Sequence, residues 1–588
     1  MPDFGVISYI ALLTAVYAVA AAVLTGMGLL LFALFRHPAT AARDLSNAPV
    51  AGWCLGIALL QVWHLWLPVD WRAIPPVLAL AGLGFWCRRA AVRGFVQSHG
   101  RRFRIALGIL LLAAAWIAEH TITQPRFGDS ALYHLSAVQW TGRFPIVPGL
   151  GNLHDRFAFN NSYFLYAAVL DTGIFSHRSH HLASGILSVL CMARILCGMA
   201  VVLGRQGRAR MHDVFDALFL VPVIVLTMGA YGFGSSPAPD YAIFVLGFFT
   251  ASELLWLLET ADDAKGRPRN RSVLQGALLF IVLLSAVGVT VKLSHLALAL
   301  LAPGLAFLAL AAARRRIWPL DTATLLWVLS IGIGAFVPWM IRGVILCGYM
   351  AYPMTVGAFP VEWRLPASEL ERMQRVLRGW ARKWERGHSH TLGNWRWVWP
   401  WLNRIVRRPF EVMTPVFMGA LFPLFGILAA RGRSQRRRVF PVWLFLLVPV
   451  LGIVFWFLTC PMPRYSGVSF WMLGAGGAAL ALRYAKRDTR AACVLALTAV
   501  LFFMNVELMP FVRTWRIHTG PAWTGNTKVM TTRSGLQVHV PVEGDRCWDA
   551  PLPCTPYFKT NLRLRVEGDM AKGFVVDADN RPRRSFRE

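Results

Sequence analysis

The chain has 588 residues, of which 56% are hydrophobic and 15% are charged, and its formal net charge is +30. A mean hydropathy of +0.49 excludes an ordinary soluble domain. The basic residues cluster in short segments between long apolar runs, which indicates membrane loops and argues against nucleic acid as a partner. We therefore expect an all-α polytopic membrane protein.

Apolar stretches long enough to cross a bilayer recur from one end of the chain to the other. They predict about fourteen membrane spans within a membrane domain that covers residues 1–509. In chain order, the candidate spans are 7–35, 50–67, 74–87, 105–120, 182–203, 214–231, 239–258, 273–291, 293–312, 322–347, 410–429, 439–458, 467–482 and 491–509.

Lys and Arg residues are concentrated in alternate loops between these spans. The clusters lie near 88–104, 205–210, 265–271, 314–316, 431–438 and 483–490. The intervening short loops contain only Arg72, Lys292 and Arg464. Because cytoplasmic loops carry an excess of Lys and Arg, this pattern predicts that both termini and the loop after the fourth span lie outside the cytoplasm.

Three segments are then extracytoplasmic and large enough to form a catalytic or binding site: 121–181, 348–409 and a C-terminal domain at 510–588. Segment 160–175 is apolar but short, and it carries Asp171. If it crossed the membrane, every later basic loop would face outward, so we expect it to be re-entrant or interfacial.

An amphipathic helix is predicted in the second of these segments. Ser368 and Glu371 have the spacing of a capping box directly after Pro366. The pattern fits an interfacial helix on anionic headgroups and equally a helix that covers the other loops. Its apolar stripe consists of Leu370, Met373, Leu377, Trp380 and Trp384.

The C-terminal domain is predicted to be a small β-rich appendage. Hydrophobic residues alternate with the period of a β-strand at 536–542 and again at 562–566. Cys547 and Cys554 lie seven residues apart in a compartment that the topology makes oxidising. We expect them to form a disulfide, with two free thiols as the alternative.

The first large segment carries the leading catalytic candidate, Asp129, directly before a predicted helix at 130–140. An outward-facing carboxylate there would act as a general base, or would hold a divalent cation that polarises a phosphate. Helix capping is the structural alternative, because Asp is a favoured N-cap. Tyr133, His134 and His154 are candidates for substrate contact, and each histidine also suits a hydrogen-bonded structural role.

Further ionisable residues are expected at the same membrane face. Asp240 lies at the outer end of a predicted span, and three cations, Lys292, Arg342 and Arg464, lie near the outer ends of others. Ionisable residues at membrane depth usually line a pathway or bind a charged group, and Arg suits phosphate. Helix capping for the acid and snorkelling for the cations are the alternatives.

Short motifs in this order resemble the C-type glycosyltransferase superfamily. An acid on the first large outer loop is followed by Tyr-His, and later come a Lys-Leu-Ser, an Arg before Gly-Tyr and Tyr-Pro, and a Pro-Arg-Tyr. The segments VPGLGNLH (147–154) and CWDAPLPCTPY (547–557) are similar to those of a largely uncharacterised bacterial multi-pass subgroup. The resemblance covers most of the chain.

This resemblance implies transfer of a sugar from a polyprenyl-phosphate donor to a glycan, lipid or protein acceptor, at the periplasmic face of the bacterial cytoplasmic (inner) membrane. Asp129 would be the base. Arg464, or else Arg342 or Lys292, would neutralise the leaving phosphate, with Tyr465 beside it. Many members have a second acid where this chain has Ser130, so a requirement for Mg or Mn stays open. A flippase for a lipid-linked glycan and a glycan polymerase or ligase are the competing functions; membrane lipids are partners in each case.

Overall fold

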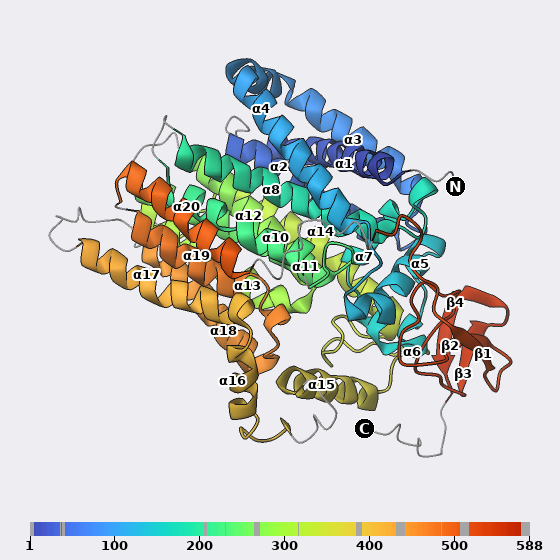
Figure 1. Cartoon of the computed structure of the whole chain (residues 1–588). Coiled ribbons are helices and arrows are strands. Elements are labelled where there is room, and N and C mark those ends of the chain that lie inside the picture. Colours follow the sequence, from blue (N-terminus) through green and yellow to red (C-terminus); the bar gives the residue numbers. More distant parts are fainter. Residues whose placement is uncertain are drawn as a thin grey trace.

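Figure 1 shows a computed structural model of the chain, which is mostly helical with a small β region near its C-terminal end. The structure describes residues 5–35, 37, 42–204, 209–229, 231–263, 271–314, 317–383, 391–430, 442–483, 485–505 and 517–577. Trp384, most of the basic loop clusters and both ends of the C-terminal domain lie outside these ranges.

In the described part of the chain, every predicted span overlaps a helix. Within the described residues, eleven helical segments are long and apolar enough to cross a membrane, so the chain is a multi-pass integral membrane protein. Two of the fourteen predicted spans are shorter apolar helices, and the helix at the last predicted span, 491–509, begins earlier with the charged residues Arg487, Asp488 and Arg490. The helices of the bundle are α1 (Val6–Leu34), α2 (Ala42–Trp63), α3 (Ile74–Cys87), α4 (Arg89–Thr121), α8 (Ala183–Leu203), α9 (Met211–Leu218), α10 (Leu220–Met228), α11 (Pro239–Asp263), α12 (Arg271–Val291), α13 (Leu296–Arg314), α14 (Thr322–Cys347), α17 (Thr414–Ala430), α18 (Leu447–Thr459), α19 (Ser469–Leu482) and α20 (Arg487–Met504).

The basic segment at 88–104 was expected to be a loop, but it is helical and forms the first part of α4. No Pro interrupts residues 89–121, and the segment is rich in Ala, Arg and Leu, which favour helix over the whole length. The helix therefore continues beyond the predicted span.

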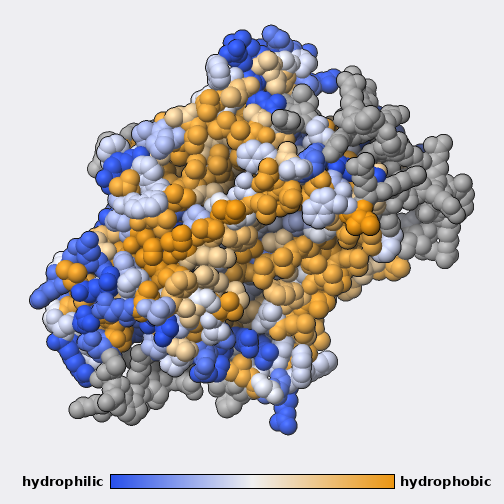
Figure 2. Space-filling view, turned by 180° about the vertical axis from the view of Figure 1, so that it is seen from behind, coloured by the Kyte–Doolittle hydropathy of each residue, from blue (hydrophilic) through white to orange (hydrophobic). Residues whose placement is uncertain are grey.

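The centre of the bundle is formed by α10, α11 and α12, which are almost entirely buried, whereas α1, α4 and α14 lie at its periphery. The peripheral helices expose apolar side chains such as Leu112 and Ile333. Figure 2 shows the result on one face, an apolar band with hydrophilic residues gathered beyond it. Lipid tails are the natural contact for such a band.

Hydrogen bonds show which helix ends lie together at each end of the bundle. At one end the side chain of Arg210 bonds to Thr260 (3.1 Å) and that of Arg490 to the backbone of Ala209. At the other end the backbone of Val69 bonds to that of Thr141 (3.0 Å). Thr260 lies near the C-terminal end of α11 and Asp240 lies in its first turn, so these two residues, which the charge pattern assigned to opposite faces, lie at opposite ends of one helix.

Short helices cover the second end of the bundle (Figure 1). Helices α5 (Leu135–Arg143), α6 (Leu150–Leu153) and α7 (Tyr163–Leu170) lie between α4 and α8. With eight residues, α7 spans about 12 Å at 1.5 Å per residue, so segment 160–175 does not cross the membrane. Helices α15 (Ala367–Arg382) and α16 (Val398–Val406) follow α14.

Helix α15 begins one residue earlier than its predicted cap. Pro366 occupies the N-cap position and no side chain caps the helix, so the predicted capping box of Ser368 and Glu371 is wrong. Leu370 and Met373 are buried in one cluster with residues of the loop that follows α14. This part of the apolar stripe therefore covers another loop.

The β region consists of two antiparallel hairpins, β1 (Thr527–Thr531) with β2 (Gln537–Pro541) and β3 (Leu562–Val566) with β4 (Asp569–Val576). A disulfide joins Cys547 and Cys554 between them. The region docks on the 121–181 segment: the backbone N–H of Trp548 donates to Ala131 O at 2.7 Å, and that of Phe574 donates to Pro148 O at 2.9 Å.

Candidate functional site

Asp129 is positioned by a π-helical turn, Ser130–His134, that separates it from α5, where a single helix at 130–140 was expected. Its side chain makes no capping hydrogen bond, so the capping alternative is wrong. Instead, its Oδ2 accepts a hydrogen bond from Arg464 Nη1 at 2.9 Å, and its Oδ1 lies 3.7 Å from Arg156 Nη1. Widened π turns of this kind are frequent at functional sites.

Arg464 lies on the short 3₁₀ turn Pro463–Ser466 between α18 and α19. Its Nη2 donates to the hydroxyl of Tyr465 at 3.1 Å, and its guanidinium lies 5.0 Å from the ring centre of Phe127 and 5.2 Å from that of Trp380. Its Nε is buried without a hydrogen-bond partner within the described part of the chain. This aromatic surround fixes the guanidinium and leaves one donor unused.

The second acid pairs with the second cation. Lys292 lies directly after α12 and Asp240 lies in the first turn of α11, and Lys292 Nζ donates to Asp240 Oδ1 at 2.6 Å. The same ammonium is 4.6 Å from the ring centre of Tyr465, which links this pair to Arg464. We call Asp129, Arg156, Asp240, Lys292 and Arg464 the charged cluster.

Arg156 is the member of the charged cluster that the sequence did not single out. It lies on the 3₁₀ turn Asp155–Phe159, directly after the VPGLGNLH segment. Nothing in its local sequence separates it from Arg126, Arg143 and Arg178 of the same insert. Only the fold places it beside Asp129.

The charges of the cluster stabilise one another. Burial alone would raise the pKa of Asp129, but the positive charges of Arg464 and Arg156 outweigh it and lower the pKa to about 2. Burial disfavours the charge of Arg464, yet Tyr465 and Asp129 hold its pKa well above the usual value. With three cations and two acids, the cluster has room for one more negative charge.

Tyr133, His134 and His154 form a buried layer beside the charged cluster. The rings of Tyr133 and His134 lie 4.5 Å apart, and burial lowers the pKa of His134 to about 3, which keeps it neutral. His154 accepts a hydrogen bond from the backbone N–H of Arg156 at 3.2 Å and packs edge-on against Tyr557 of the β region. In the structure, His154 orders the turn that carries Arg156.

A mostly apolar pocket opens beside Arg464, and we call it the Arg464 pocket. Its polar lining includes Asp240 and Glu411 besides Arg464. The remaining wall is largely aromatic and aliphatic, with Leu226, Phe233, Tyr241, Phe244, Phe410, Phe470 and Trp471. Such a lining suits a hydrophobic ligand with one charged end.

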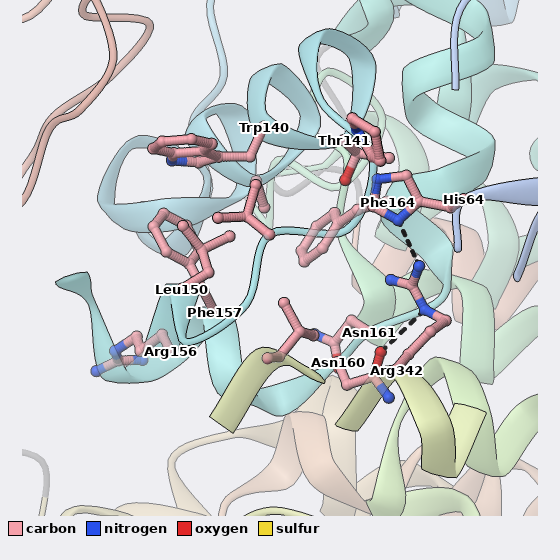
Figure 3. A pocket seen from close by; sticks show the side chains of 14 residues that line it. His64, Trp140, Thr141, Leu150, Arg156, Phe157, Asn160, Asn161, Phe164 and Arg342 are labelled. Atoms are coloured by element: carbon pink, nitrogen blue, oxygen red, sulfur yellow. Dashed lines mark hydrogen bonds between the residues drawn. The ribbon is translucent and has the colours of Figure 1, made fainter. Parts of the chain in front are cut away.

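A second pocket is lined by Arg156, whose guanidinium lies 3.7 Å from Asp129, and we call it the Arg342 pocket (Figure 3). Arg342 and Arg156 both line it, and Figure 3 shows them on opposite sides. Arg342 was expected to meet Asp129 in one site, but its side chain bonds to His64 and Asn160 instead. Arg156 is therefore the link between this pocket and Asp129.

The residues of the charged cluster do not fit a divalent metal ion. Both carboxylate oxygens of Asp129 face guanidinium groups, and one oxygen of Asp240 accepts from Lys292. Across the described ranges, no group of three His, Cys, Asp or Glu side chains is arranged to hold a metal ion. Cations thus occupy the positions where Mg or Mn would have to bind.

The fold and the site define a multi-pass integral membrane protein with a charged cluster and two pockets at one end of its helix bundle. The model of a family described as a domain of unknown function (DUF8201) matches residues 9–471, and the chain belongs to this family. The match includes the whole charged cluster and ends before the β region. No curated protein and no solved structure matches the chain.

Proposed function

We propose that this protein is a membrane glycosyltransferase that moves a sugar from a polyprenyl-phosphate-linked donor to a glycan, lipid or protein acceptor. The observation that carries the proposal is the position of Asp129 between two arginines that line different pockets. A group-transfer enzyme must hold two substrates next to each other, and two separate pockets near one base can do so.

The Arg464 pocket suits the donor. Its aromatic and aliphatic wall offers a dry surface to the first isoprene units, and Arg464 and Lys292 offer positive charge to the phosphate. The buried Nε of Arg464 has no hydrogen-bond partner among the described residues, so a phosphate that displaces its surroundings would satisfy this donor. Charge-assisted bonds from Arg to phosphate are among the strongest that a side chain makes.

The proposed sugar transfer needs only Asp129, Arg464, Lys292 and the two substrates to account for every bond, proton and leaving group. The acceptor hydroxyl oxygen forms a bond to the anomeric carbon of the sugar, and the bond from that carbon to the phosphate oxygen breaks. The proton of the hydroxyl passes to Asp129, and the bonding electron pair leaves with the lipid phosphate. Arg464 and Lys292 stabilise the charge that develops on the leaving group.

The ion pair of Asp129 with Arg464 makes the base dependent on the donor. A carboxylate with a pKa of about 2 accepts a proton poorly at neutral pH. A phosphate at Arg464 competes with Asp129 for the guanidinium and adds negative charge beside the carboxylate, and both effects raise the pKa of Asp129. The base thus becomes stronger when the donor is bound.

Asp240 of the charged cluster lies in the first turn of α11, whereas Arg210, which borders a basic segment, bonds to Thr260 near the other end of that helix. The excess of Lys and Arg in the alternate short loops of the sequence favours a periplasmic location for the cluster. The short motifs shared with C-type glycosyltransferases support the same orientation and reaction. A bacterial cytoplasmic membrane is the location that this proposal implies.

The test compares cells that contain the wild-type chain, no chain, or the Asp129→Asn variant, with extraction and mass spectrometry of their lipid-linked sugars. We expect one polyprenyl-phosphate-linked sugar to accumulate without the chain and equally with the variant. Full complementation by Asp129→Asn would contradict the proposal and favour a flippase, which needs no base. Accumulation of a longer lipid-linked glycan precursor instead of a single sugar would indicate a polymerase or ligase.

A further inference from the structure

Arg342 is a buried cation that the proposed reaction does not use. It lies near the end of α14, and only 4% of its surface is exposed. Its Nε donates to Asn160 Oδ1 at 3.2 Å, and its Nη1 donates to His64 Nδ1. In the described part of the chain, neither partner carries a negative charge, so the charge of Arg342 is uncompensated.

The two partners are themselves fixed as acceptors. The Nε2–H of His64 donates to Phe144 O at 3.1 Å, which leaves Nδ1 as the acceptor on a neutral ring. The amide nitrogen of Asn160 donates to Trp339 O at 2.7 Å, while the indole of Trp339 donates to Asn160 O at 3.0 Å. This network holds the guanidinium in one orientation without neutralising it.

One donor of Arg342 is left for a ligand. Among the described residues, Nη2 has no hydrogen-bond partner. Figure 3 shows this terminal nitrogen pointing toward the middle of the Arg342 pocket. Burying a charge is costly unless it is paired, so an anionic group in the pocket would complete the site.

The rest of the lining suits a carbohydrate ring. Trp140, Phe157 and Phe164 offer apolar faces, and Figure 3 shows them around the pocket. The side-chain amide of Asn161, also in the lining, makes no hydrogen bond within the described residues. Aromatic walls with a few free polar donors bind sugars by contact with the ring and by hydrogen bonds to the hydroxyls.

We propose that the Arg342 pocket binds an acidic carbohydrate, with Nη2 of Arg342 donating to its carboxylate or phosphate group and the aromatic wall contacting its ring. The pocket shares Arg156 with Asp129, which lies 3.7 Å from that guanidinium. The ligand is therefore the acceptor of the transfer reaction. This last step rests on the proposed function, whereas binding of the acidic sugar does not.

The test measures binding to the purified full chain in lipid nanodiscs, with no donor present. The probes are glucuronate, glucose and inorganic phosphate at equal ionic strength, and the readouts are calorimetry and the midpoint of thermal unfolding. We expect glucuronate to bind more tightly than either other probe and to raise the midpoint. Arg342→Gln should weaken glucuronate binding about tenfold to a hundredfold, the loss of one charge-assisted hydrogen bond, and Arg342→Lys should weaken it less.

Two further variants keep the outcome decisive. Asn161→Ala changes only the pocket surface, so it should weaken glucuronate binding even if Arg342→Gln does not fold. Arg464→Gln should leave glucuronate binding unchanged. Equal binding of glucuronate and glucose would overturn the role of Arg342, and equal binding of glucuronate and phosphate would overturn the carbohydrate assignment. Absence of sugar transfer by the wild-type chain, together with intact glucuronate binding, would count against the proposed function and not against this site.

Discussion

Arg464 Nη1 donates a hydrogen bond to Asp129 Oδ2 at 2.9 Å, across 335 positions of sequence. The contact joins the segment after α4 to the turn between α18 and α19. Neither group is solvent-exposed to more than one fifth of its side chain, so the pair is poorly screened. A ligand phosphate that binds Arg464 has to compete with this carboxylate.

Asp129→Asn removes the proton acceptor and keeps the size of the side chain. We expect the rate of sugar transfer to fall about 100- to 10,000-fold, the usual contribution of a general base. The measurement is release of polyprenyl phosphate by the purified chain. Asp171→Asn is the matched control, because Asp171 lies on the same segment and accepts a hydrogen bond from the backbone of Ser179. Equal losses in both variants would refute a special role for Asp129.

Arg464→Gln should weaken binding of the donor more than binding of the acceptor. The variant removes the charge beside the Arg464 pocket and leaves the Arg342 pocket intact. We expect the donor affinity to fall about tenfold to a hundredfold. The measurement is the dissociation constant for a short-chain polyprenyl phosphate. Arg375→Gln, which removes an exposed arginine of α15 paired with Glu371, should leave this constant unchanged.

The proximity of Asp129 to Arg464 could be predicted from the sequence because it depends mainly on the membrane topology. Hydropathy places the spans, and the alternation of basic loops then assigns Asp129, Asp240, Lys292 and Arg464 to one end of the bundle. Few ionisable groups remain at that end, and opposite charges there attract. The alternating residues at 536–542 likewise predict β2, because strand periodicity is a local signal.

The division of the site into two pockets could not be predicted from the sequence. Arg342 lies at the predicted end of the bundle, but its side chain donates a hydrogen bond to Asn160. Asn160 adopts a left-handed backbone conformation (φ 53°) after the turn Asp155–Phe159. Arg156 reaches Asp129 through the same turn. Such turns depend on tertiary packing of an irregular segment, and periodicity does not report on them.

Removal of divalent cations should leave sugar transfer unchanged. The oxygens of Asp129 face Arg464 and Arg156, so cations already occupy the positions that a metal would take. The measurement is the transfer rate of the purified chain before and after dialysis against a chelator. A loss of activity that Mg or Mn restores would show that the substrate brings a metal into the site.

Reduction of the disulfide between Cys547 and Cys554 should loosen the β region without unfolding the helix bundle. A bridge that closes so short a loop stabilises by about 2–3 kcal/mol through the entropy of the unfolded segment. We expect faster hydrogen exchange in β1 to β4 for the Cys547→Ser and Cys554→Ser double variant. Exchange in the buried helices α11 and α12 is the internal control. Unchanged exchange in the strands would mean that their docking on the 121–181 segment suffices to hold them.

Docking of the β region should weaken as the pH rises, because His177 joins the 121–181 segment to Asp549. His177 Nδ1 lies 2.5 Å from Asp549 Oδ2, and this hydrogen bond raises the pKa of His177 above 6.5 although partial burial opposes it. A raised pKa in the folded state means that the contribution to stability is complete below pH 6.5 and is lost as the pH rises through the raised pKa. The measurement is hydrogen exchange at Ala522, whose N–H donates to His177 O, from about pH 5 to about pH 9, corrected for the intrinsic rate. His177→Gln should abolish the pH dependence and His539→Gln should preserve it, whereas the same dependence in all three proteins would assign it to another group.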